Sequence, residues 1–472
     1  MNRQIVQLFG LSLVLFALLI AGTSWWTVFG NEDLRANESN RRELIEQQQV
    51  PRGLVLARDG TVLAKSEPRG KGLQRTFTRT YPTGPLFSHT VGYSFVSVGQ
   101  AGLEQSRNDD LTGEQSEFGT LFSDLQGRAQ EGQDVTTTLD PEAQRIAQQA
   151  LGGQNGSVVA IEPQTGRVRV MVSLPAFDAN EISKSGKIAS FNRATQSSYP
   201  PGSTFKVVTA AAALDSGKFS PDSVVDGSSP RTISGAPLAN SGGADFGPIT
   251  LTEALTNSVN TVWAQVAEQI GPGTLLKYMN RFGFNSDPQL DFPDDQMLAS
   301  GIRNSKGNLV RRDGGFDIGR VAIGQGGAEG QIQVTPLQMA LVAGAVGNKG
   351  KLMRPRLVEK VVDKDGRVTD RIQPEEQEQV MSEESAGELA QMMSNVVQEG
   401  TGTAAALSGI DVAGKTGTAE VDNATSNQAW FIAFAPVENP RMAIAVTVER
   451  TSGQGGTVAA PIAKQVLEAL IG

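Results

Sequence analysis

A helix is expected to begin within residues 199–214, whose sequence is YPPGSTFKVVTAAAAL. The two prolines and Gly202 stop the element before it, and the apolar residues after Ser203 follow a helical period. Ser203 therefore falls at a helix N-terminus, where unpaired N–H groups and the helix dipole favour developing negative charge. Lys206 lies three residues later, so it is expected one turn above Ser203 on the same face.

The pair Ser203 and Lys206 has two interpretations. A serine becomes nucleophilic when a base lies beside it, and a desolvated lysine near another cation is neutral enough to act as that base. Alternatively, Ser203 only caps the helix and Lys206 is a solvated lysine of its first turn. Because Ser-x-x-Lys is expected roughly once by chance in a chain of this length, the pair alone does not decide between them.

A second candidate, Ser258-Val259-Asn260, lies between helices that are expected at 251–258 and 260–270. A hydroxyl at this place is suited to relaying a proton, and the Asn260 amide to holding a substrate amide. The pattern Ser-x-Asn also occurs at residues 106–108 and 190–192. By itself it therefore carries little information.

A third candidate is Lys415-Thr416-Gly417-Thr418, near the start of a strand expected at 411–421. Glycine weakens a strand and often marks a place where a ligand backbone approaches closely. Lys415 and Thr416 supply a cation and a hydroxyl for a substrate carboxylate, and the exposed main chain is suited to pairing with an extended peptide. The alternative is an edge-strand lysine that opposes aggregation.

Together the three segments are stronger evidence for a catalytic site than any one of them alone. Each falls on the structural element that its chemistry needs, and the other two Ser-x-Asn matches precede Ser203. Ser-x-x-Lys and Lys-Thr-Gly, with a serine segment between them, are typical of penicillin-binding proteins and class A β-lactamases. The sequence therefore favours acyl transfer through Ser203.

The N-terminus predicts a membrane anchor. No charged side chain occurs from residue 4 to residue 31, a length that can span a bilayer. Arg3 precedes this segment and Glu32 follows it, so the positive-inside rule places the N-terminus in the cytoplasm and the rest of the chain outside. Trp25 and Trp26 lie where an interfacial aromatic belt is expected. A cleaved signal peptide is the alternative, but the apolar run is long for one.

The order of expected elements predicts an anchor at 1–30, a small loop-rich pedestal at 31–155 and a larger domain at 156–472. The polar residues 34–50 suit a stalk that leaves the membrane, and Asp59-Gly60 suits a hairpin turn between two pedestal strands. The elements expected after residue 139 are a helix at 140–151, strands at 157–161 and 167–173, helices at 204–215, 251–258, 260–270, 335–347 and 383–398, strands at 411–421, 429–434 and 442–448, and a helix at 461–470. This order predicts an α+β fold in which both ends of the larger domain meet in one antiparallel sheet flanked by helices.

Composition excludes several other classes of protein. The chain has 472 residues, a net charge of −9 and a pI near 5.0, which disfavours a nucleic-acid binder. It has no cysteine, which excludes disulfides, thiolate metal sites and cysteine nucleophiles. His89 is the single histidine, so a multi-histidine metal site is excluded and a Ser-His-Asp triad would have to use this residue.

The trio and several shorter motifs resemble the class B penicillin-binding proteins, over essentially the whole chain. The shorter motifs are Pro51-Arg52-Gly53, Arg58-Asp59-Gly60, Tyr81-Pro82-Thr83-Gly84, His89-Thr90-Val91-Gly92-Tyr93, Gly102-Leu103-Glu104, Leu111-Thr112-Gly113, Ala429-Trp430-Phe431 and Phe434-Ala435-Pro436. The resemblance implies a transpeptidase fold preceded by a non-catalytic pedestal. On this resemblance His89 is a pedestal residue and not a catalyst.

The resemblance also implies a mechanism of D,D-transpeptidation without metal or cofactor. Ser203 would be the nucleophile and Lys206 the base that deprotonates it. Ser258 would pass the proton to the departing D-alanine nitrogen, and Lys415 would raise the local positive potential and help to keep Lys206 neutral. The acyl-enzyme is then attacked by an amine from a neighbouring stem peptide, and β-lactams acylate the same serine.

The remaining residues of the trio would bind substrate. The backbone N–H groups of Ser203 and Thr418 would form the oxyanion hole, and Asn260 would hold the donor peptide. Thr416 would bind the terminal carboxylate, next to Gly417. The resemblance further implies a polytopic SEDS-type glycosyltransferase, and other membrane proteins of division or elongation, as partners.

Departures from the motifs of related families reduce the number of activities that are expected for this chain. The Glu-x-x-Leu-Asn segment of class A β-lactamases is missing after Asn260, where the nearest match is Asp295-Gln296-Met297-Leu298-Ala299, so fast deacylation by water is not expected. Residues 31–155 lack the room and the motifs of a glycosyltransferase. The alternatives that remain are a D,D-carboxypeptidase, a non-catalytic scaffold of the division or elongation complex, and a penicillin-sensing receptor, which would need a cytoplasmic signalling domain.

Overall fold

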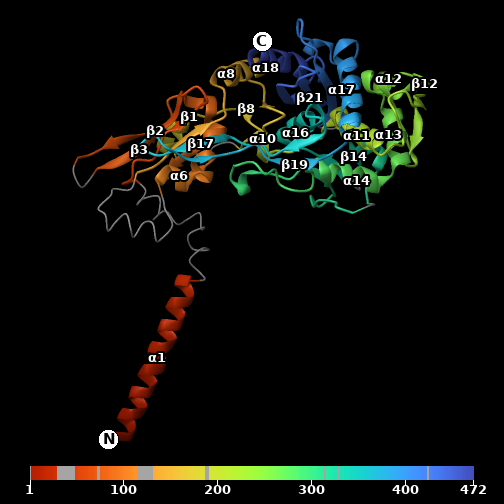
Figure 1. Cartoon of the computed structure of the whole chain (residues 1–472). Helices are drawn as coiled ribbons and strands as arrows, with labels where there is room; N and C mark the ends of the chain where they lie inside the picture. The colour runs from red at the N-terminus through yellow and green to blue at the C-terminus, as the bar shows by residue number, and fades with distance from the viewer. Residues whose placement is uncertain are drawn as a thin grey trace.

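The computed structural model describes residues 2–28, 48–71, 75–113, 131–185, 191–312, 315–327, 330–421 and 425–472. An N-terminal helix, α1, stands apart from an elongated body (Figure 1). Most of the predicted stalk and the acidic residue Glu32 lie outside the described residues.

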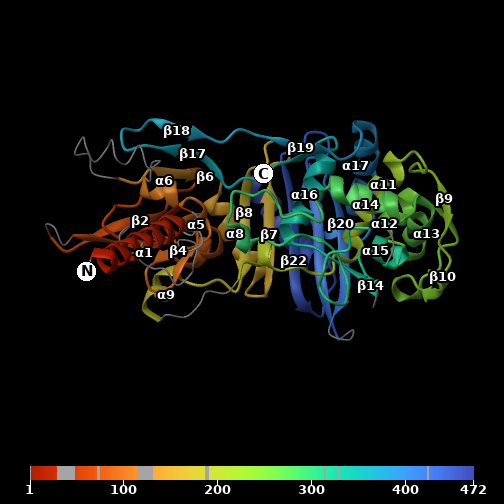
Figure 2. The same cartoon turned by 90° about the horizontal axis from the view of Figure 1, so that it is seen from below.

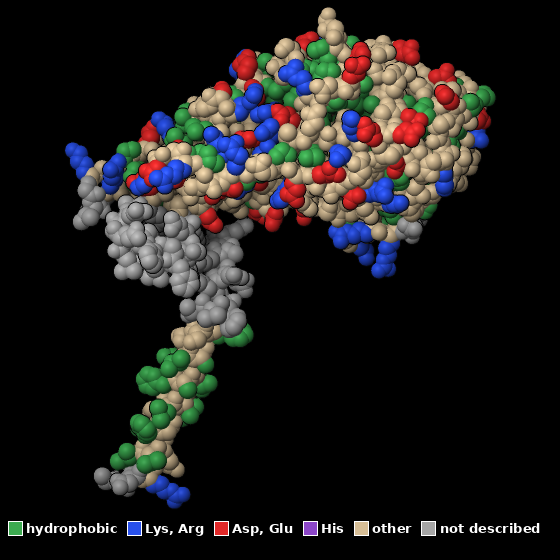
Figure 3. All heavy atoms as spheres, in the orientation of Figure 1, with side chains coloured by type: hydrophobic (Ala, Val, Ile, Leu, Met, Phe, Trp, Pro, Cys, Tyr) green, Lys and Arg blue, Asp and Glu red, His purple; other side chains and the backbone are tan. Residues whose placement is uncertain are grey.

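Helix α1 (Asn2–Val28) fits a single-pass membrane anchor. The 23 residues Arg3–Trp25 have a mean hydropathy of 2.5, and none of the most apolar window is buried against the body. At 1.5 Å per residue this length crosses the ~30 Å hydrocarbon core of a bilayer. Figure 3 shows hydrophobic side chains along the helix and Lys or Arg only at its free end. Within the described part of the chain, no other helix is both long and apolar enough to do this.

One end of the body is a six-stranded sheet, here called the pedestal sheet, with the strand order β18-β17-β6-β1-β2-β3. Its strands are β1 (Val55–Leu56), β2 (Val62–Arg69), β3 (Thr76–Thr80), β6 (Asp134–Thr137), β17 (Val358–Val362) and β18 (Val368–Arg371). The predicted hairpin is confirmed, because β1 and β2 pair antiparallel around Gly60, whose φ is +88°.

Two strands of the pedestal sheet come from far along the chain. Strand β17 pairs antiparallel with β6, and β18 continues the sheet beyond it. Residues 358–371 were not expected to join the pedestal. The proposed boundary at residue 155 remains a prediction, but the pedestal sheet draws strands from both sides of it.

The pedestal core contains a buried ionic cluster of Arg52, Arg79 and Glu104. The side chain of Glu104 is fully buried and lies 3.0 Å from Arg52 Nη2 and 2.5 Å from Arg79 Nε. Arg79 Nη1 also donates to the Gly53 carbonyl at 2.7 Å. Breaking a buried ion pair leaves an uncompensated charge, so Glu104 holds two segments of the pedestal together.

We expect Glu104→Gln to destabilise the pedestal by about 3–5 kcal/mol, because two buried guanidinium groups lose their counter-charge. Urea unfolding followed by tryptophan fluorescence and circular dichroism measures this change. The matched control is Glu142→Gln on the surface of α8, where the carboxylate pairs with exposed Arg145, and this variant should keep the wild-type midpoint. Equal midpoints for both variants would contradict the stabilising role of Glu104.

The larger domain is built on a five-stranded antiparallel sheet with the order β20-β21-β22-β7-β8. Its strands are β7 (Gly156–Ile161), β8 (Val168–Leu174), β20 (Ala413–Val421), β21 (Ser426–Ala435) and β22 (Met442–Thr451). Strand β22 pairs antiparallel with β7, from Ala443 opposite Ile161 to Val448 opposite Gly156. The predicted α+β fold, in which both ends of the domain meet in one sheet, is confirmed.

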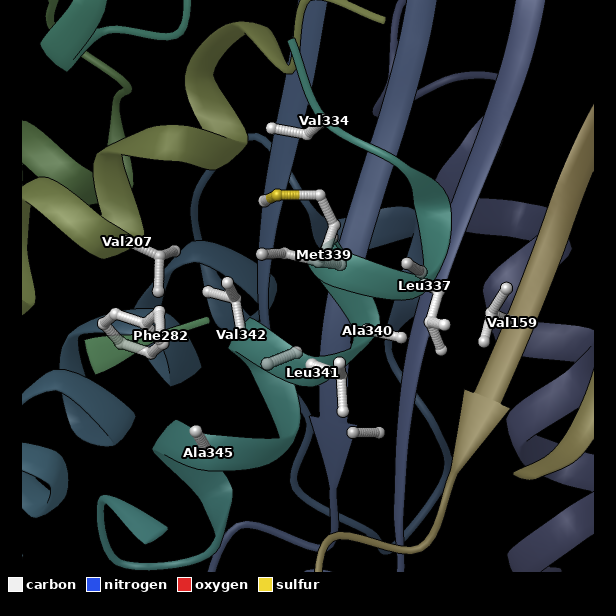
Figure 4. Packing of buried hydrophobic residues seen from close by; sticks show 14 of the residues in the cluster. Val159, Val207, Phe282, Val334, Leu337, Met339, Ala340, Leu341, Val342 and Ala345 are labelled. Carbon is white, nitrogen blue, oxygen red and sulfur yellow. The ribbon is translucent and has the colours of Figure 1, made fainter. Parts of the chain in front are cut away.

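Alternating side chains of this sheet supply two hydrophobic cores, one on each face. Val159 and Ile161 pack with α11 (Lys206–Asp215) and α16 (Pro336–Gly347). The neighbouring residues of β7 pack on the other face, with α8 (Pro141–Leu151) and α18 (Ala459–Ile471). Figure 4 shows the side chains of α16 filling the space between β7 and α11.

Further helices lie beyond β20, at the end of the body opposite the pedestal sheet (Figure 2). They are α12 (Leu251–Thr256), α13 (Asn260–Ile270), α14 (Pro272–Arg281), α15 (Ile318–Ala322) and α17 (Glu383–Gln398). The shorter elements of the body are α4 (Ser88–Val91), α5 (Leu103–Ser106), α6 (Asn108–Thr112), α9 (Ala179–Ser185), α10 (Arg193–Gln196), β4 (Tyr93–Phe95), β5 (Gly99–Ala101), β9 (Val224–Asp226), β10 (Arg231–Ile233), β11 (Ala236–Leu238), β12 (Pro248–Thr250), β13 (Gly301–Arg303), β14 (Gly326–Gly327), β15 (Gly330–Gln333), β16 (Lys351–Met353) and β19 (Glu376–Gln379). Strand β20 is therefore an edge strand of the central sheet that faces a helical layer.

Candidate active site

Ser203 lies in a 3-10 turn, η3 (Gly202–Phe205), that runs directly into α11. Gly202 before it has a φ of +53°, and a Cβ there would lie 2.8 Å from the Thr418 carbonyl oxygen on β20. Only glycine suits such a position. The serine is half-buried, and its turn lies between α11 and the edge strand β20.

Lys206 is fully buried, which excludes a solvated first-turn lysine. Its Nζ donates to Asn260 Oδ1 at 2.7 Å, to the Ser258 carbonyl at 2.6 Å and to Ser258 Oγ at 3.2 Å. The lysine of the first segment and the serine and asparagine of the second are thus in direct contact. Asn260 Nδ2 in turn donates to the Ala239 carbonyl at 3.2 Å, which fixes the orientation of the amide.

Lys415 brings the third segment to the same point. It is fully buried, and its Nζ donates to Ser258 Oγ at 3.0 Å and to the Thr416 carbonyl at 3.1 Å. The Ser258 hydroxyl therefore lies between two lysines. Ser258 itself has a φ of +58°, a strained conformation for a residue other than glycine, which is typical of functional sites.

Burial lowers the pKa of both lysines. Desolvation, and then the charge of Lys415, lowers the pKa of Lys206 well below its ordinary value. Desolvation lowers the pKa of Lys415 to about 7. Because a buried ammonium group is costly next to a second cation, the pair favours a neutral Lys206 beside a charged Lys415.

The edge strand β20 carries the remaining predicted residues. Thr416 Oγ1 lies 2.6 Å from Thr401 Oγ1, and Thr418 Oγ1 accepts a hydrogen bond from the Gly455 N–H at 3.1 Å. A Cβ at Gly417 would lie 2.6 Å from the Pro201 carbonyl oxygen. The close approach expected at this glycine is therefore made by the turn that carries Ser203, and it sets the separation between the turn and the strand.

Several residues that complete the site were not found from the sequence. Thr401, Gly324, Trp430 and Gly455 each contact one of the three segments. A Cβ at Gly324 would lie 1.7 Å from the Gly202 carbonyl oxygen, and the Trp430 indole N–H donates to the Pro200 carbonyl at 3.0 Å. Gly324 and Gly455 are signalled only by the glycine-rich composition of residues 324–327 and 453–456. Trp430 lies in the motif Ala429-Trp430-Phe431, which did not itself indicate a contact with the Ser203 turn.

His89 takes no part in this cluster. Its ring is buried, its Nε2 lies 3.0 Å from the Pro175 carbonyl oxygen, and burial lowers its pKa to about 4. The site therefore combines a serine with two lysines and a second serine, a set suited to nucleophilic acyl transfer in which lysine takes the place of histidine as base.

Two family models match the chain. Residues 156–468 match the penicillin binding protein transpeptidase domain, and residues 52–135 match the penicillin binding protein A dimerisation domain. The chain therefore belongs to the penicillin-binding protein transpeptidases. It is a class B enzyme of this family, a serine-type peptidoglycan D,D-transpeptidase of cell-wall synthesis.

Individual relatives agree with this assignment. The chain is 33% identical to the peptidoglycan D,D-transpeptidase PbpA of Mycolicibacterium smegmatis, over 100% of this chain and 99% of the relative. The ceftriaxone acyl-enzyme of penicillin-binding protein A from M. tuberculosis is 30% identical with a TM-score of 0.79, over 91% of this chain and 100% of the solved one. The penicillin G acyl-enzyme of the same protein has a TM-score of 0.77 at 30% identity, over 90% and 100%.

Proposed function

We propose that Ser203 is the nucleophile of this transpeptidase and that Lys206 is its general base. The observation that carries the proposal is the contact chain from Lys206 Nζ to Ser258 Oγ, at 3.2 Å, and on to Lys415 Nζ, at 3.0 Å. A buried lysine held near a second cation is the environment that makes lysine a base at neutral pH.

Acylation then moves one proton from the Ser203 hydroxyl to the leaving group, by way of Lys206 and Ser258. Neutral Lys206 takes the proton of the Ser203 hydroxyl as Oγ attacks the carbonyl carbon of the penultimate D-alanine. The C–N bond breaks, and the proton passes through the Ser258 hydroxyl to the departing nitrogen of the terminal D-alanine. Lys206 is neutral again at the end of the step, and a β-lactam reacts in the same way through its ring amide.

Strand β20, the Ser203 turn and Asn260 together supply the electrostatic and binding groups. The N–H groups of Ser203 and Thr418 stabilise the oxyanion, and removing one such donor typically costs roughly 10²–10³ in rate. Thr416, held by Thr401, binds the terminal carboxylate beside the positive charge of Lys415, next to Gly417. The Asn260 amide holds the donor peptide and lies within hydrogen-bonding distance of Lys206.

The acceptor is an amine of a second stem peptide. A D,D-carboxypeptidase, which uses water, is the alternative within the same mechanism. Incubation of the full-length protein in lipid nanodiscs with a donor pentapeptide separates the two, because a transpeptidase needs an added amine acceptor to form product. Release of D-alanine at the same rate without any acceptor would favour the carboxypeptidase.

The charge pattern at the N-terminus supports a topology in which α1 enters from the cytoplasm and the body lies outside. On this topology a SEDS-type glycosyltransferase, and other membrane proteins of division or elongation, would contact α1 and the pedestal. A scaffold without activity is the competing role. Complementation of a depleted strain tests it, since Ser203→Ala should fail and full rescue by that variant would favour the scaffold.

We expect acylation to slow as the pH rises above about 7, because Lys415 then loses the positive charge that lies beside the bound substrate carboxylate. The folded pKa of Lys415 lies below its unfolded value of 10.5, so the unfolded chain binds more protons between these two pH values. Its deprotonation therefore stabilises the fold by up to about 1.4 kcal/mol per pH unit over this window.

Two measurements from pH 6 to 10 follow these trends. Stopped-flow kinetics with a chromogenic cephalosporin give the acylation rate, and urea unfolding gives the free energy of unfolding. Lys415→Arg is the matched variant, since guanidinium stays charged throughout this range. Its acylation rate should lack the decline near pH 7. A decline of the same size in this variant would assign the titration to another group.

A further inference from the structure

The loop between β22 and α18 crosses strand β20 beside the substrate-binding residues. Gly455 in this loop donates its N–H to Thr418 Oγ1 at 3.1 Å. A Cβ at Gly455 would lie 2.2 Å from the Trp430 carbonyl oxygen and 2.3 Å from the Gly417 carbonyl oxygen. Gly417 and Trp430 are opposite each other in the β20–β21 ladder, so Gly455 rests directly on the backbone of this pair.

The need for glycine at position 455 is steric. Gly455 does not adopt a positive φ, so its conformation is open to other residues, and only the contact with backbone atoms excludes a side chain. Gly417 is also contacted by Pro201 of the Ser203 turn. Strand β20 is therefore held at this one residue between the nucleophile turn and Gly455, which leaves Thr418 little freedom to move relative to Ser203.

The neighbouring Gly456 contacts a different part of the site. A Cβ there would lie 2.5 Å from the Thr401 carbonyl oxygen. Thr401 is the residue whose hydroxyl lies 2.6 Å from Thr416 Oγ1, and its N–H donates to the Thr256 carbonyl at 3.4 Å. Gly456 therefore supports the Thr401–Thr416 hydroxyl pair, as Gly455 supports Thr418.

We propose that Gly455 and Gly456 are positioning residues that act on two different steps of acylation. Gly455 fixes Thr418, whose N–H stabilises charge that develops only in the transition state, so it controls the rate constant of acylation. Gly456 fixes the hydroxyl pair that binds a carboxylate already present in the ground state, so it controls binding. The inference rests on the roles proposed above for Thr416 and Thr418.

Gly455→Ala and Gly456→Ala test this division. With penicillin G at varied concentration, stopped-flow and quenched intact-mass measurements on the full-length protein give the acylation rate constant and the apparent dissociation constant separately. Because misplacement by about 1 Å costs up to roughly 10²-fold in rate, Gly455→Ala should lower the rate constant at least about tenfold, with little change in binding. Gly456→Ala should weaken binding by a similar factor, with little change in the rate constant.

Gly387→Ala in α17 is the control. Gly387 has no positive φ and a Cβ there would meet nothing within 4 Å, so both constants should stay at their wild-type values. Rates are taken on the fraction of protein that becomes acylated, which removes any contribution from misfolded molecules.

Two outcomes would overturn the proposal: both variants changing the two constants alike, or neither variant changing either constant. If one variant yields no folded protein, the other still decides, because each has its own expected signature. Failure of the underlying mechanism has a different signature, since the wild-type protein would then form no adduct on Ser203.

Discussion

Lys206→Met should slow acylation of Ser203 by roughly 10²–10⁴, the range that a positioned general base contributes. Lys206 Nζ is the buried group that links Ser258 and Asn260, and burial together with Lys415 lowers its pKa. Methionine has a similar length and is uncharged, so it suits a buried site and removes the base with little disturbance of packing.

Time-resolved intact mass with penicillin G measures the effect. The control is Lys306→Met, at an exposed lysine, which should acylate at the wild-type rate. Thermal unfolding of the two variants should show that Lys206→Met remains folded, since the methionine side chain fills the buried site without an ionisable group. Acylation within about threefold of wild type, well below the contribution of a general base, would exclude Lys206 as the base.

Gly324→Ala should cause the largest loss among single-methyl substitutions near the site. A Cβ at Gly324 would lie 1.7 Å from the Gly202 carbonyl oxygen and 2.7 Å from its nitrogen, and Gly324 has a φ of +78°. The backbone of the Ser203 turn must move to admit this methyl group. We expect acylation to fall by about 10²-fold or more, because displacement of about 1 Å is enough for such a loss.

A second glycine separates this steric effect from backbone strain. Gly366 has a similar φ of +82°, but a Cβ there meets nothing within 4 Å. Gly366→Ala therefore introduces the same conformational strain in the β17–β18 hairpin without touching the site. The two variants should lose similar stability from strain, and only Gly324→Ala should lose acylation. Equal acylation rates would show that the Ser203 turn tolerates displacement.

The long elements were predictable because their signals are local, and the candidate site residues were proposed from local signals of the same kind. Helix α8, with Asp140 as its N-cap, and helix α17, with bounds of 383–398, lie where the sequence placed them. The same holds for the three final strands, whose β-branched and apolar runs are long enough to show their period. Lys206, Ser258 and Lys415 were also proposed together, since each segment carries its own composition signal.

Features that depend on distant segments were not predictable. Strands β17 and β18 join the pedestal sheet because β17 pairs with β6, more than two hundred residues earlier, and no local pattern encodes this partner. The shortest strands, such as β9 and β13, have only three residues each, which is too few to show alternation. The positive φ of Ser258 and the contact of Gly455 with Gly417 depend on tertiary packing in the same way.

The most direct test of the central claim is the intact mass of the full-length protein after incubation with penicillin G, for wild type beside Ser203→Ala. We expect the wild type to gain one drug mass, located on the peptide that contains Ser203, and the variant to gain none. An adduct that persists in the variant, or intact wild-type protein beside consumed drug, would contradict a stable acyl-enzyme on Ser203.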